Sequence, residues 1–392
     1  MMIRSINKIK KKIYLFGSGL VAKKTINKFQ HIKFAGIIDN SKNLAGQTFD
    51  NLKIYGPNII NKKNFYIITS TSFSEISAQL EKLGLRRNIN YIISPLLKDV
   101  EILSGLENLE KSFLITSGSP TQKKNFYGGG IYLVSLKGDS WNYKKIYNGN
   151  CYGIIKVKNK IFAVDENVGI VEFNYKLKKR KTYHIEKGHR PHGLTFCEIS
   201  QQFFLCCTDK DQIIVFDKNF KAKDRILISE KIIKNKIKNH HINDCIAIDG
   251  RLYVSMFSIS GNFNKEIYDG SILEIDIFDT DKRNIITNNL WMPHNICYYD
   301  NSIHVLNSFK GELLAYNLKV IGKFPAFARG LDYDGNYYYV GQSRNRNFSK
   351  LLGDSLNISI DTGVTIFEPE KKLSRFLQLH PKLSEIHSVL LI

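Results

Sequence analysis

Six short segments of the sequence each begin with a polar or amphipathic residue, and each opens an apolar run typical of a β-strand. The clearest is "MPHNICYYDNSIHVLNSF", in which a histidine precedes an apolar run, a D-N turn and a second strand-like run. Imidazoles bind metals and transfer protons, and a guanidinium group binds carboxylates or phosphates. Aligned on their turns, the segments give six equivalent first positions: Tyr152, His192, Asn243, His294, Arg329 and His387.

The elements that carry these positions repeat through the last three quarters of the chain. From Ser112 onward, strand triplets recur in units of roughly 35–58 residues, which is typical of a β-propeller. We predict six blades, with residues 387–392 closing the ring as the inner strand of the blade whose outer strands lie in 112–147. Closure leaves no exposed sheet edge. The six equivalent residues would then surround one mouth of the central channel.

Polar groups that converge on a concave surface predict a binding site. We hypothesise that His192, His294 and His387 bind one metal ion that activates water or polarises a sugar oxygen. His240 and Glu385 are candidates for supporting contacts or proton transfer. In the alternative interpretation, these side chains only hydrogen-bond to channel water. The further predicted ligand-binding residues are Tyr152, His241, Asn243, Asp244, Arg329 and Arg344.

The first part of the chain has a different pattern. "KKIYLFGSGLVAKKTINKF" predicts a strand, a glycine turn and a helix, and the strand "IKFAGIID" follows it. Alternating strands and helices predict a small α/β Rossmann-like domain with a parallel sheet over residues 1–96. A helical linker would cover 97–111, and the propeller 112–392.

The glycine turn of this domain is a candidate phosphate site. Gly17, Ser18 and Gly19 lie where the first strand meets its helix, so the backbone can approach a phosphate closely. Asp39 ends the second strand, where an acidic residue commonly binds a ribose hydroxyl. Ala22 replaces the third glycine of G-x-G-x-x-G, which leaves open a domain that packs without binding a cofactor.

Residues 12 to about 95 resemble the N-terminal domain of sugar acyltransferases of the bacillosamine acetyltransferase type. The resemblance rests on "LFGSGLVAKK", "FAGIIDNS", "GQTFDNLKIYGP" and "YIITSTS". In that family the domain helps to hold a nucleotide-linked sugar, which implies such a role for Gly17, Gly19 and Asp39. The hexapeptide repeats that carry acyl transfer in the family are absent from this chain.

Most of residues 112–392 resembles a bacterial six-bladed β-propeller family of unknown function. The residues that carry the resemblance are "HINDCIAIDGRLYVSMFS", "MPHNICYYDNSIHVLNSFKGEL" and "FARGLDYDGNYYYVGQSRNRNF". They match the family's H-x-D, P-H-S, R-G-L and V-G-x-S-x-x-R elements in order, although "MPHN" departs from P-H-S. The resemblance implies the fold and no established activity.

The composition of the chain indicates which kinds of partner and which location to expect. The net charge is +21, but only 12 of the 57 basic residues are arginines and the lysines are scattered, so we expect no nucleic-acid partner. No apolar run approaches the ~18 residues that would indicate a membrane span. The basic N-terminus is followed by a strand without a cleavage site, so we expect no signal peptide and a cytoplasmic protein with reduced cysteines.

Two functional hypotheses follow. The first is a role in bacterial cell-surface glycan biosynthesis or modification, with a nucleotide-linked sugar or glycan as ligand. If this role is enzymatic, metal-assisted lyase, hydrolase or isomerase chemistry fits the three histidines, although the sequence identifies no catalytic residue. The alternative is a non-catalytic propeller scaffold, since fold does not imply function. A nicotinamide-dependent enzyme is a weaker third possibility, because the glycine pattern is incomplete.

Overall fold

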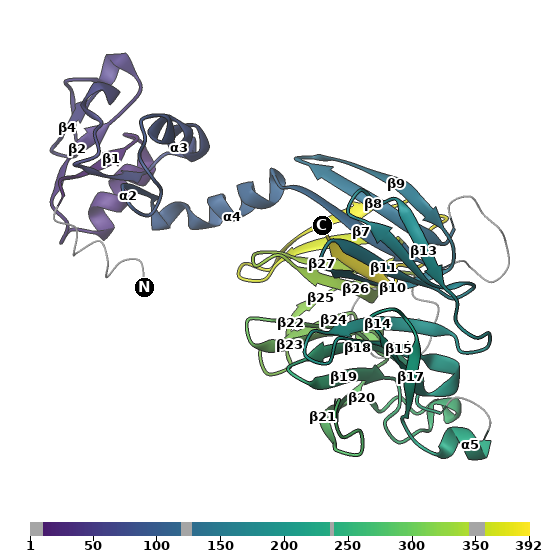
Figure 1. Ribbon diagram of the computed structural model, residues 1–392. Coiled ribbons are helices and arrows are strands. Elements are labelled where there is room, and N and C mark those ends of the chain that lie inside the picture. The colour runs from purple at the N-terminus through teal and green to yellow at the C-terminus, as the bar shows by residue number, and fades with distance from the viewer. Residues whose placement is uncertain (1–10, 119–127, 236–238, 345–356) are drawn as a thin grey trace. The chain divides into compact units, whose positions relative to one another are not determined.

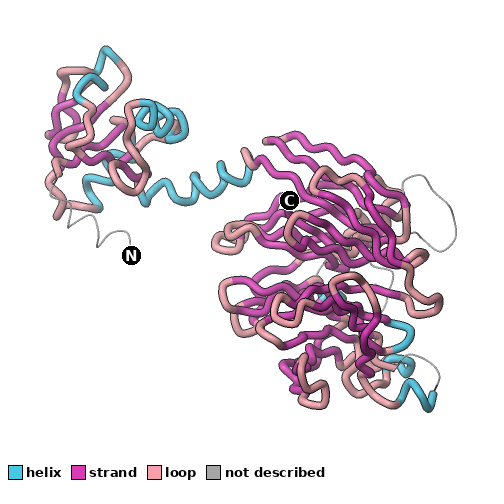
Figure 2. Tube along the Cα trace, in the orientation of Figure 1, coloured by secondary structure: helices cyan, strands magenta, loops and turns pink. Residues whose placement is uncertain are grey.

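The computed structural model describes residues 11–118, 128–235, 239–344 and 357–392. The chain divides into two compact units, Met1–Glu107 and Asn108–Ile392 (Figure 1). Strands dominate the second unit, whereas helices and strands alternate in the first (Figure 2). The longest helices of the described chain have ten residues, too few to cross a bilayer.

The first unit contains a six-stranded sheet with the order β3-β4-β2-β1-β5-β6. Five strands are parallel, and β3 is antiparallel to β4. The sheet is therefore mixed, whereas the sequence predicted a parallel sheet. Its strands are β1 (Ile13–Phe16), β2 (Phe34–Ile38), β3 (Thr48–Phe49), β4 (Leu52–Tyr55), β5 (Phe65–Ile68) and β6 (Tyr91–Ile93). The helices are α2 (Leu20–Lys28), α3 (Phe73–Lys82), α4 (Lys98–Glu107), η1 (Lys42–Leu44), η2 (Pro57–Ile59) and η3 (Pro95–Leu97).

Alternation along β1 gives this sheet two apolar faces. Leu15 is buried in one cluster with Phe29, at the end of α2, and Phe16 in another with Leu80 of α3. Successive side chains of a strand point to opposite faces, so each helix covers one face of the sheet. After η3, α4 occupies most of the predicted linker, and the first strand of the second unit begins at Glu110, two residues before the predicted boundary.

The second unit consists of six four-stranded antiparallel sheets, each with one inner strand. The inner strands are β10 (Cys151–Val157), β14 (Pro191–Cys197), β18 (Ile242–Ile248), β22 (Pro293–Tyr299), β26 (Phe327–Tyr333) and β30 (Ser388–Leu391). The second strands are β11 (Lys160–Asp165), β15 (Gln202–Cys207), β19 (Arg251–Met256), β23 (Ser302–Asn307), β27 (Tyr338–Ser343) and β7 (Glu110–Ser117).

The outer half of each sheet follows the same plan. The third strands are β12 (Gly169–Asn174), β16 (Gln212–Asp217), β20 (Gly270–Asp276), β24 (Glu312–Ala315), β28 (Gly363–Glu368) and β8 (Gly130–Lys137). The outermost are β13 (Lys179–Tyr183), β17 (Ala222–Leu227), β21 (Arg283–Leu290), β25 (Lys319–Lys323), β29 (Leu373–Gln378) and β9 (Ser140–Asn148). Short helices α5 (Lys231–Asn235), η4 (Thr208–Lys210), η5 (Phe263–Lys265) and η6 (Ser308–Lys310) lie in the connections.

This architecture is a six-bladed β-propeller. Consecutive inner strands are neighbours around the ring, from β10 through β14, β18, β22 and β26 to β30 and back to β10. The predicted first positions fall at the starts of these strands, with His387 one residue before β30. In the last sheet, β30 pairs with β7, and Ser388 lies opposite Thr116.

Apolar clusters between adjacent blades hold the ring together. One cluster combines Phe204 and Ile213 of one blade with Leu252 and Val254 of the next. All four side chains are almost fully buried, and side chains from facing sheets interdigitate in this way. The blades therefore form a rigid frame around the inner strands.

Candidate functional site

A pocket of about 290 Å³ lies at the end of the propeller where the inner strands begin. It brings together the six register-equivalent residues predicted from the sequence, and His241, Arg344 and Glu385 also line it. We call it the mouth pocket. Its lining residues at the strand starts are Tyr152, His192, Asn243, His294, Arg329 and His387.

Backbone irregularities at the strand starts position these side chains. Pairing with the second strand is interrupted in β10, β14, β18, β22 and β26. Tyr152, His192, Asn243 and Arg329 lie inside the interrupted stretches, and His294 lies at the edge of one. A β-bulge of this kind redirects a side chain and is common beside functional sites.

Arg329, Glu385 and His387 form a buried hydrogen-bonded group. Arg329 Nη1 donates to His387 Nδ1 over 3.3 Å. A guanidinium group cannot accept a hydrogen bond, so Nδ1 must be the acceptor and Nε2 carries the proton of the neutral ring. His387 Nε2 accordingly donates to Glu385 Oε2 over 3.1 Å. Glu385 Oε1 lies 3.6 Å from Arg329 Nη2, so both carboxylate oxygens have partners.

Three buried imidazoles of the mouth pocket are neutral at pH 7. Burial, followed by the charge of Arg329, lowers the pKa of His387 to about 4. Burial also holds the pKa of His192 and of His294 well below the ordinary value, with Arg190 as the next cause for His192 and Arg329 for His294. Neutral imidazoles can donate or accept a hydrogen bond or a proton.

Tyr152 packs against two of these imidazoles. The centre of its ring lies 4.1 Å from that of His192 and 4.3 Å from that of His387. Its hydroxyl donates to Glu166 Oε2 over 3.1 Å. Burial and then the charge of Glu166 raise the pKa of Tyr152 to about 12, so the hydroxyl stays protonated.

The opposite side of the mouth pocket is aromatic. The His241 ring stacks on Phe257, with centroids 4.2 Å apart and planes 5° apart. The His294 ring lies 5.2 Å from Phe257 and 5.5 Å from Phe327. His294 Nδ1 lies 3.0 Å from the carbonyl oxygen of Met292, which can only accept, so Nδ1 is the donor of the neutral ring.

The sequence analysis missed one of the three arginines that line the mouth pocket. Arg190 precedes the Pro-His pair that opens β14, and it has a left-handed backbone with φ of 46°. Its Nε lies 3.8 Å from Glu166 Oε1. Together with Arg329 and Arg344 it brings three guanidinium groups to the pocket. The carboxylates of Glu166 and Glu385 lie beside two of them, which leaves an excess of positive charge that attracts anions.

Two polar atoms in the pocket are buried and lack a partner within the described chain. They are Nε2 of His192 and Oδ1 of Asn243, whose side chains are 7% and 2% exposed. Leaving a buried polar atom unpaired costs about 1–3 kcal/mol. A ligand that supplied both partners would recover this cost.

The three predicted metal ligands do not form a metal-binding group. Within the described residues, no cluster of three His, Cys, Asp or Glu side chains could hold a metal ion. The rings of His192 and His387 are 6.2 Å apart, and the Tyr152 ring packs against both of them. His387 also has Arg329 on one nitrogen and Glu385 on the other. The arrangement of the three imidazoles therefore does not fit a shared metal ion.

Two other predicted residues lie away from the mouth pocket. Asp244 lines a different cavity and accepts a hydrogen bond from the backbone N–H of Ile296. His240 is buried between Ser258 and Ser229, with its ring nitrogens 2.9 and 2.7 Å from their oxygens. These contacts give His240 a role in holding the connection between blades.

The glycine turn of the first unit has the predicted backbone. Gly17 has φ of 104°, and a Cβ there would lie 3.0 Å from the Cβ of Ser70, so the position requires glycine. Asp39 accepts hydrogen bonds from the backbone N–H and the hydroxyl of Ser18 and from the N–H of Ser41. Burial alone would raise the pKa of Asp39, but these bonds outweigh it and lower the pKa.

The fold and this site define a β-propeller with a polar, positively charged mouth pocket. Residues 200–392 match the family model of a domain of unknown function, DUF4915. Residues 9–90 match the model of the C2185-like N-terminal domain. These matches do not support the resemblance to bacillosamine-type acyltransferases. No curated protein sequence matches the chain.

Solved structures similar to the chain share little of its sequence. A structure of a nidogen/laminin complex has a TM-score of 0.50 and 12% identity over 72% of this chain and 97% of that one. A protein of unknown function from Bacteroides caccae has a TM-score of 0.48 and 12% identity, covering 71% and 98%. A gluconolactonase from Xanthomonas campestris has a TM-score of 0.44 and 12% identity, covering 67% and 84%. At such identities, likeness shows the fold alone.

Proposed function

We propose that the mouth pocket binds a small acidic sugar derivative through its carboxylate or phosphate group. The observation that carries this proposal is the convergence of Arg190, Arg329 and Arg344 on one pocket. Guanidinium groups bind carboxylates and phosphates in bidentate fashion. His192 and His294 stay neutral, so a ring nitrogen that is not already bonded to the protein can donate to or accept from a sugar hydroxyl.

The two sides of the pocket match the two parts of such a ligand. Nε2 of His192 and Oδ1 of Asn243 lack partners within the described chain and can bond to sugar hydroxyls, and the Tyr152 hydroxyl oxygen can still accept a hydrogen bond. Phe257 and Phe327 offer an apolar wall to the C–H face of a sugar ring. The volume of about 290 Å³ is at the small end for ligand pockets, which favours a single sugar over a whole nucleotide-linked sugar.

The role that we propose for the protein is bacterial cell-surface glycan biosynthesis or modification. In this proposal the first unit is Rossmann-like and binds a nucleotide-linked sugar at Gly17, Ser18 and Gly19. The strand order, the glycine turn at the end of β1 and the free space around Gly19 support it. Because Asp39 is already bonded to Ser18, the ribose contact would use the remaining acceptor positions of its carboxylate.

The test of the mouth pocket is isothermal titration of the full chain with glucuronate, galacturonate and glucose 6-phosphate, with glucose as the uncharged comparison. We expect the acidic sugars to bind and glucose to bind at least about tenfold more weakly, because a charged hydrogen bond contributes about 1.5–3 kcal/mol. Arg344→Gln and Arg190→Gln should each weaken binding, whereas Arg180→Gln, on the exposed outer strand β13, should not. Equal binding of glucose, or equal affinity in all three variants, would refute the anion site.

The first unit is tested separately with UDP-glucuronate and UDP-N-acetylglucosamine. Gly19→Ala is the variant of choice, because no atom lies within 4 Å of the added Cβ and the fold should tolerate it. We expect this variant to lose affinity for the nucleotide-linked sugars and to keep its affinity for the free acidic sugar. Unchanged nucleotide-sugar binding would remove the glycine turn from the proposal.

A further inference from the structure

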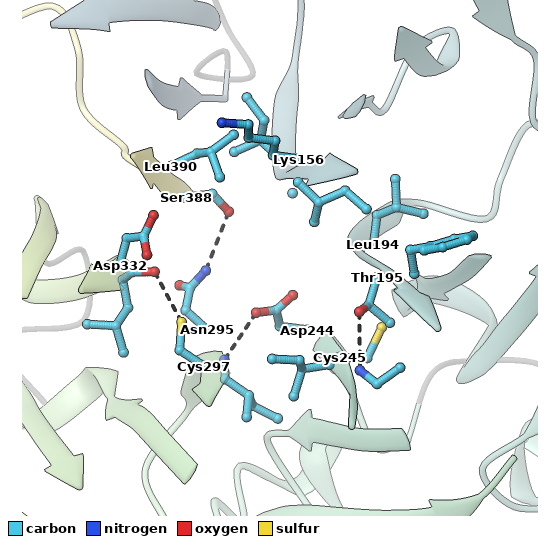
Figure 3. A pocket seen from close by; sticks show the side chains of 18 of the residues that line it. Lys156, Leu194, Thr195, Asp244, Cys245, Asn295, Cys297, Asp332, Ser388 and Leu390 are labelled. Atoms are coloured by element: carbon cyan, nitrogen blue, oxygen red, sulfur yellow. Dashed lines mark hydrogen bonds between the residues drawn. The ribbon is translucent and has the colours of Figure 1, made fainter. Parts of the chain in front are cut away.

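The propeller contains a second cavity, of about 420 Å³, farther along the same six inner strands (Figure 3). We call it the strand-end cavity. None of its lining residues lines the mouth pocket. Its walls combine polar groups with apolar side chains, among which are Leu194, Ile296, Leu331 and Val389. It is therefore a separate space with its own chemistry.

Asp244 gives this cavity a half-buried carboxylate. Its carboxylate points into the cavity (Figure 3). Oδ2 accepts one hydrogen bond, 3.2 Å long, from the N–H of Ile296. The neighbouring strand makes room for the group, since a Cβ on Gly193 would lie 2.3 Å from Oδ1 of Asp244. An ionised carboxylate has about four acceptor positions, so the backbone contacts leave capacity for a ligand.

The other polar side chains near Asp244 are already committed to the protein. Asn295 donates to the carbonyl of His387 and to Ser388 Oγ, and it accepts from the N–H of Gly330. Thr195 Oγ1 accepts from the N–H of Ala247. These bonds connect neighbouring inner strands. Asp332, a second carboxylate in the lining, accepts from the Tyr299 hydroxyl and from the N–H groups of Tyr333 and Leu391, and the lining residue Glu198 is exposed. Asp244 is thus the carboxylate of this cavity with the most acceptor capacity left for a ligand.

Within the described residues, no lysine, arginine or histidine forms an ion pair with Asp244. The chain has 57 Lys and Arg residues and only 36 Asp and Glu residues, so basic side chains are abundant enough to pair with every acidic one. Lys156 and Lys158 line the cavity but have exposed side chains. Burial raises the pKa of Asp244 to about 7, and no cationic charge offsets it. A partly desolvated carboxylate without a counter-ion attracts a cation.

We propose that the strand-end cavity binds a protonated amine, with its ammonium group on Asp244 and its carbon skeleton against Leu194, Ile296 and Leu331. An organic ammonium ion fits better than a metal ion, because Ca²⁺ needs six to eight oxygen ligands and Mg²⁺ near-octahedral coordination. The described chain offers no cluster of three acidic, histidine or cysteine side chains here. This inference is independent of the acidic-sugar proposal, since the two sites share no lining residue.

The test uses the full chain with n-butylammonium, cyclohexylammonium and benzylammonium chlorides, each compared with the alcohol of the same carbon skeleton. We expect at least one amine to raise the melting temperature and to shift the NMR signals of the inner strands, and its alcohol to do neither. Asp244→Asn keeps the shape of the side chain and should weaken amine binding about tenfold or more.

Two control variants make the outcome specific. Asp139→Asn removes a charge from an exposed turn and should leave amine binding unchanged. Arg344→Gln alters the mouth pocket and should also leave it unchanged. The proposal is overturned if no amine binds the wild-type protein, if the alcohols bind as well as the amines, or if Asp244→Asn binds as tightly as the wild type.

Discussion

The two cavities of the propeller are built from the same six strands but use their polar side chains differently. Asn243 and His294 face the mouth pocket, and the next residues, Asp244 and Asn295, line the strand-end cavity. Asn295 connects neighbouring strands, whereas Asn243 keeps a buried oxygen without a partner in the described chain. In β22, His294 lines the mouth pocket while the adjacent Asn295 connects strands, so neighbouring positions of one strand have different roles. A polar residue in a propeller channel has to be judged by its bonds and not by its location.

The charges differ as well. Three arginines make the mouth pocket positive, and burial keeps its imidazoles neutral, whereas Asp244 contributes a carboxylate to the strand-end cavity. Ligands of opposite charge are therefore expected at the two ends. Four variants test this contrast through the free energy of unfolding, which can be measured before any ligand is known.

The largest effect is expected from Arg329→Leu. This change leaves the carboxylate of Glu385 buried without its guanidinium partner, which should cost about 3–5 kcal/mol in the free energy of unfolding. Urea denaturation measures it. The double variant Arg329→Leu, Glu385→Leu removes both charges and should recover a large part of the loss. No recovery would mean that the arginine acts through packing on Phe327, above whose ring it lies.

Gly193→Ala should destabilise the protein by about 1–3 kcal/mol, because the added Cβ collides with Asp244. Gly19→Ala, with no atom within 4 Å of its Cβ, is the matched control and should change stability little. Thermal unfolding of both variants checks this expectation. If the two glycines respond alike, Asp244 is not held as closely against β14 as the structure shows.

Asp244→Asn should change how stability depends on pH. The pKa of Asp244 is raised in the folded state to about 7 from 3.8, so the folded protein binds the proton more tightly and wild-type stability falls as pH rises from about 4 to 7. Asparagine removes this fall. The free energy of unfolding of the variant, relative to that of the wild type, should rise by about 1–2 kcal/mol between pH 5 and pH 8. This is less than the full shift of the pKa would give, because the side chain is only half-buried. A constant difference across this range would contradict the raised pKa.

The smallest effect is expected from His387→Gln, with the opposite sign. The folded pKa of His387 is lowered to about 4 from 6.5, so protonation favours the unfolded chain and stability falls as pH drops below about 6.5. Glutamine removes this contribution. When the pH falls from 7 to 5.5, the free energy of unfolding should therefore decrease by about 1 kcal/mol less in the variant than in the wild type. Denaturation curves at the two pH values decide. Parallel losses would mean that His387 is not the group titrating.

The sequence predicted the propeller and the ring of six residues because both depend on a local, repeated pattern. A polar residue before each inner-strand run identified Tyr152 and His192 without any knowledge of their contacts. The prediction of a tris-histidine metal site did not allow for Arg329 and Glu385, which bond to the two ring nitrogens of His387. Side-chain placement of this kind depends on packing across blades, which the repeat pattern does not contain.

Arg190 and the aromatic wall were missed for a related reason. Phe257 and Phe263 come from the connection after β19, far from the strand start at Asn243, and only the fold brings them beside His241. Arg190 lies two residues before the predicted residue His192. The tripeptide Arg-Pro-His was the sequence signal that could have identified it. Asp244 was assigned to the mouth because it follows Asn243, but the bulge separates the directions of the two side chains.

The bulges also have an evolutionary consequence. At the start of five inner strands, residues such as Tyr152 and Arg329 do not belong to the regular ladder with the second strand. Replacing such a side chain alters the chemistry of the pocket while the ladder hydrogen bonds and the β-propensity of the blade stay as they were. Ligand preference could therefore drift among homologous propellers, or be redesigned in this one, by substitutions at a few strand-start positions on a scaffold that is otherwise unchanged.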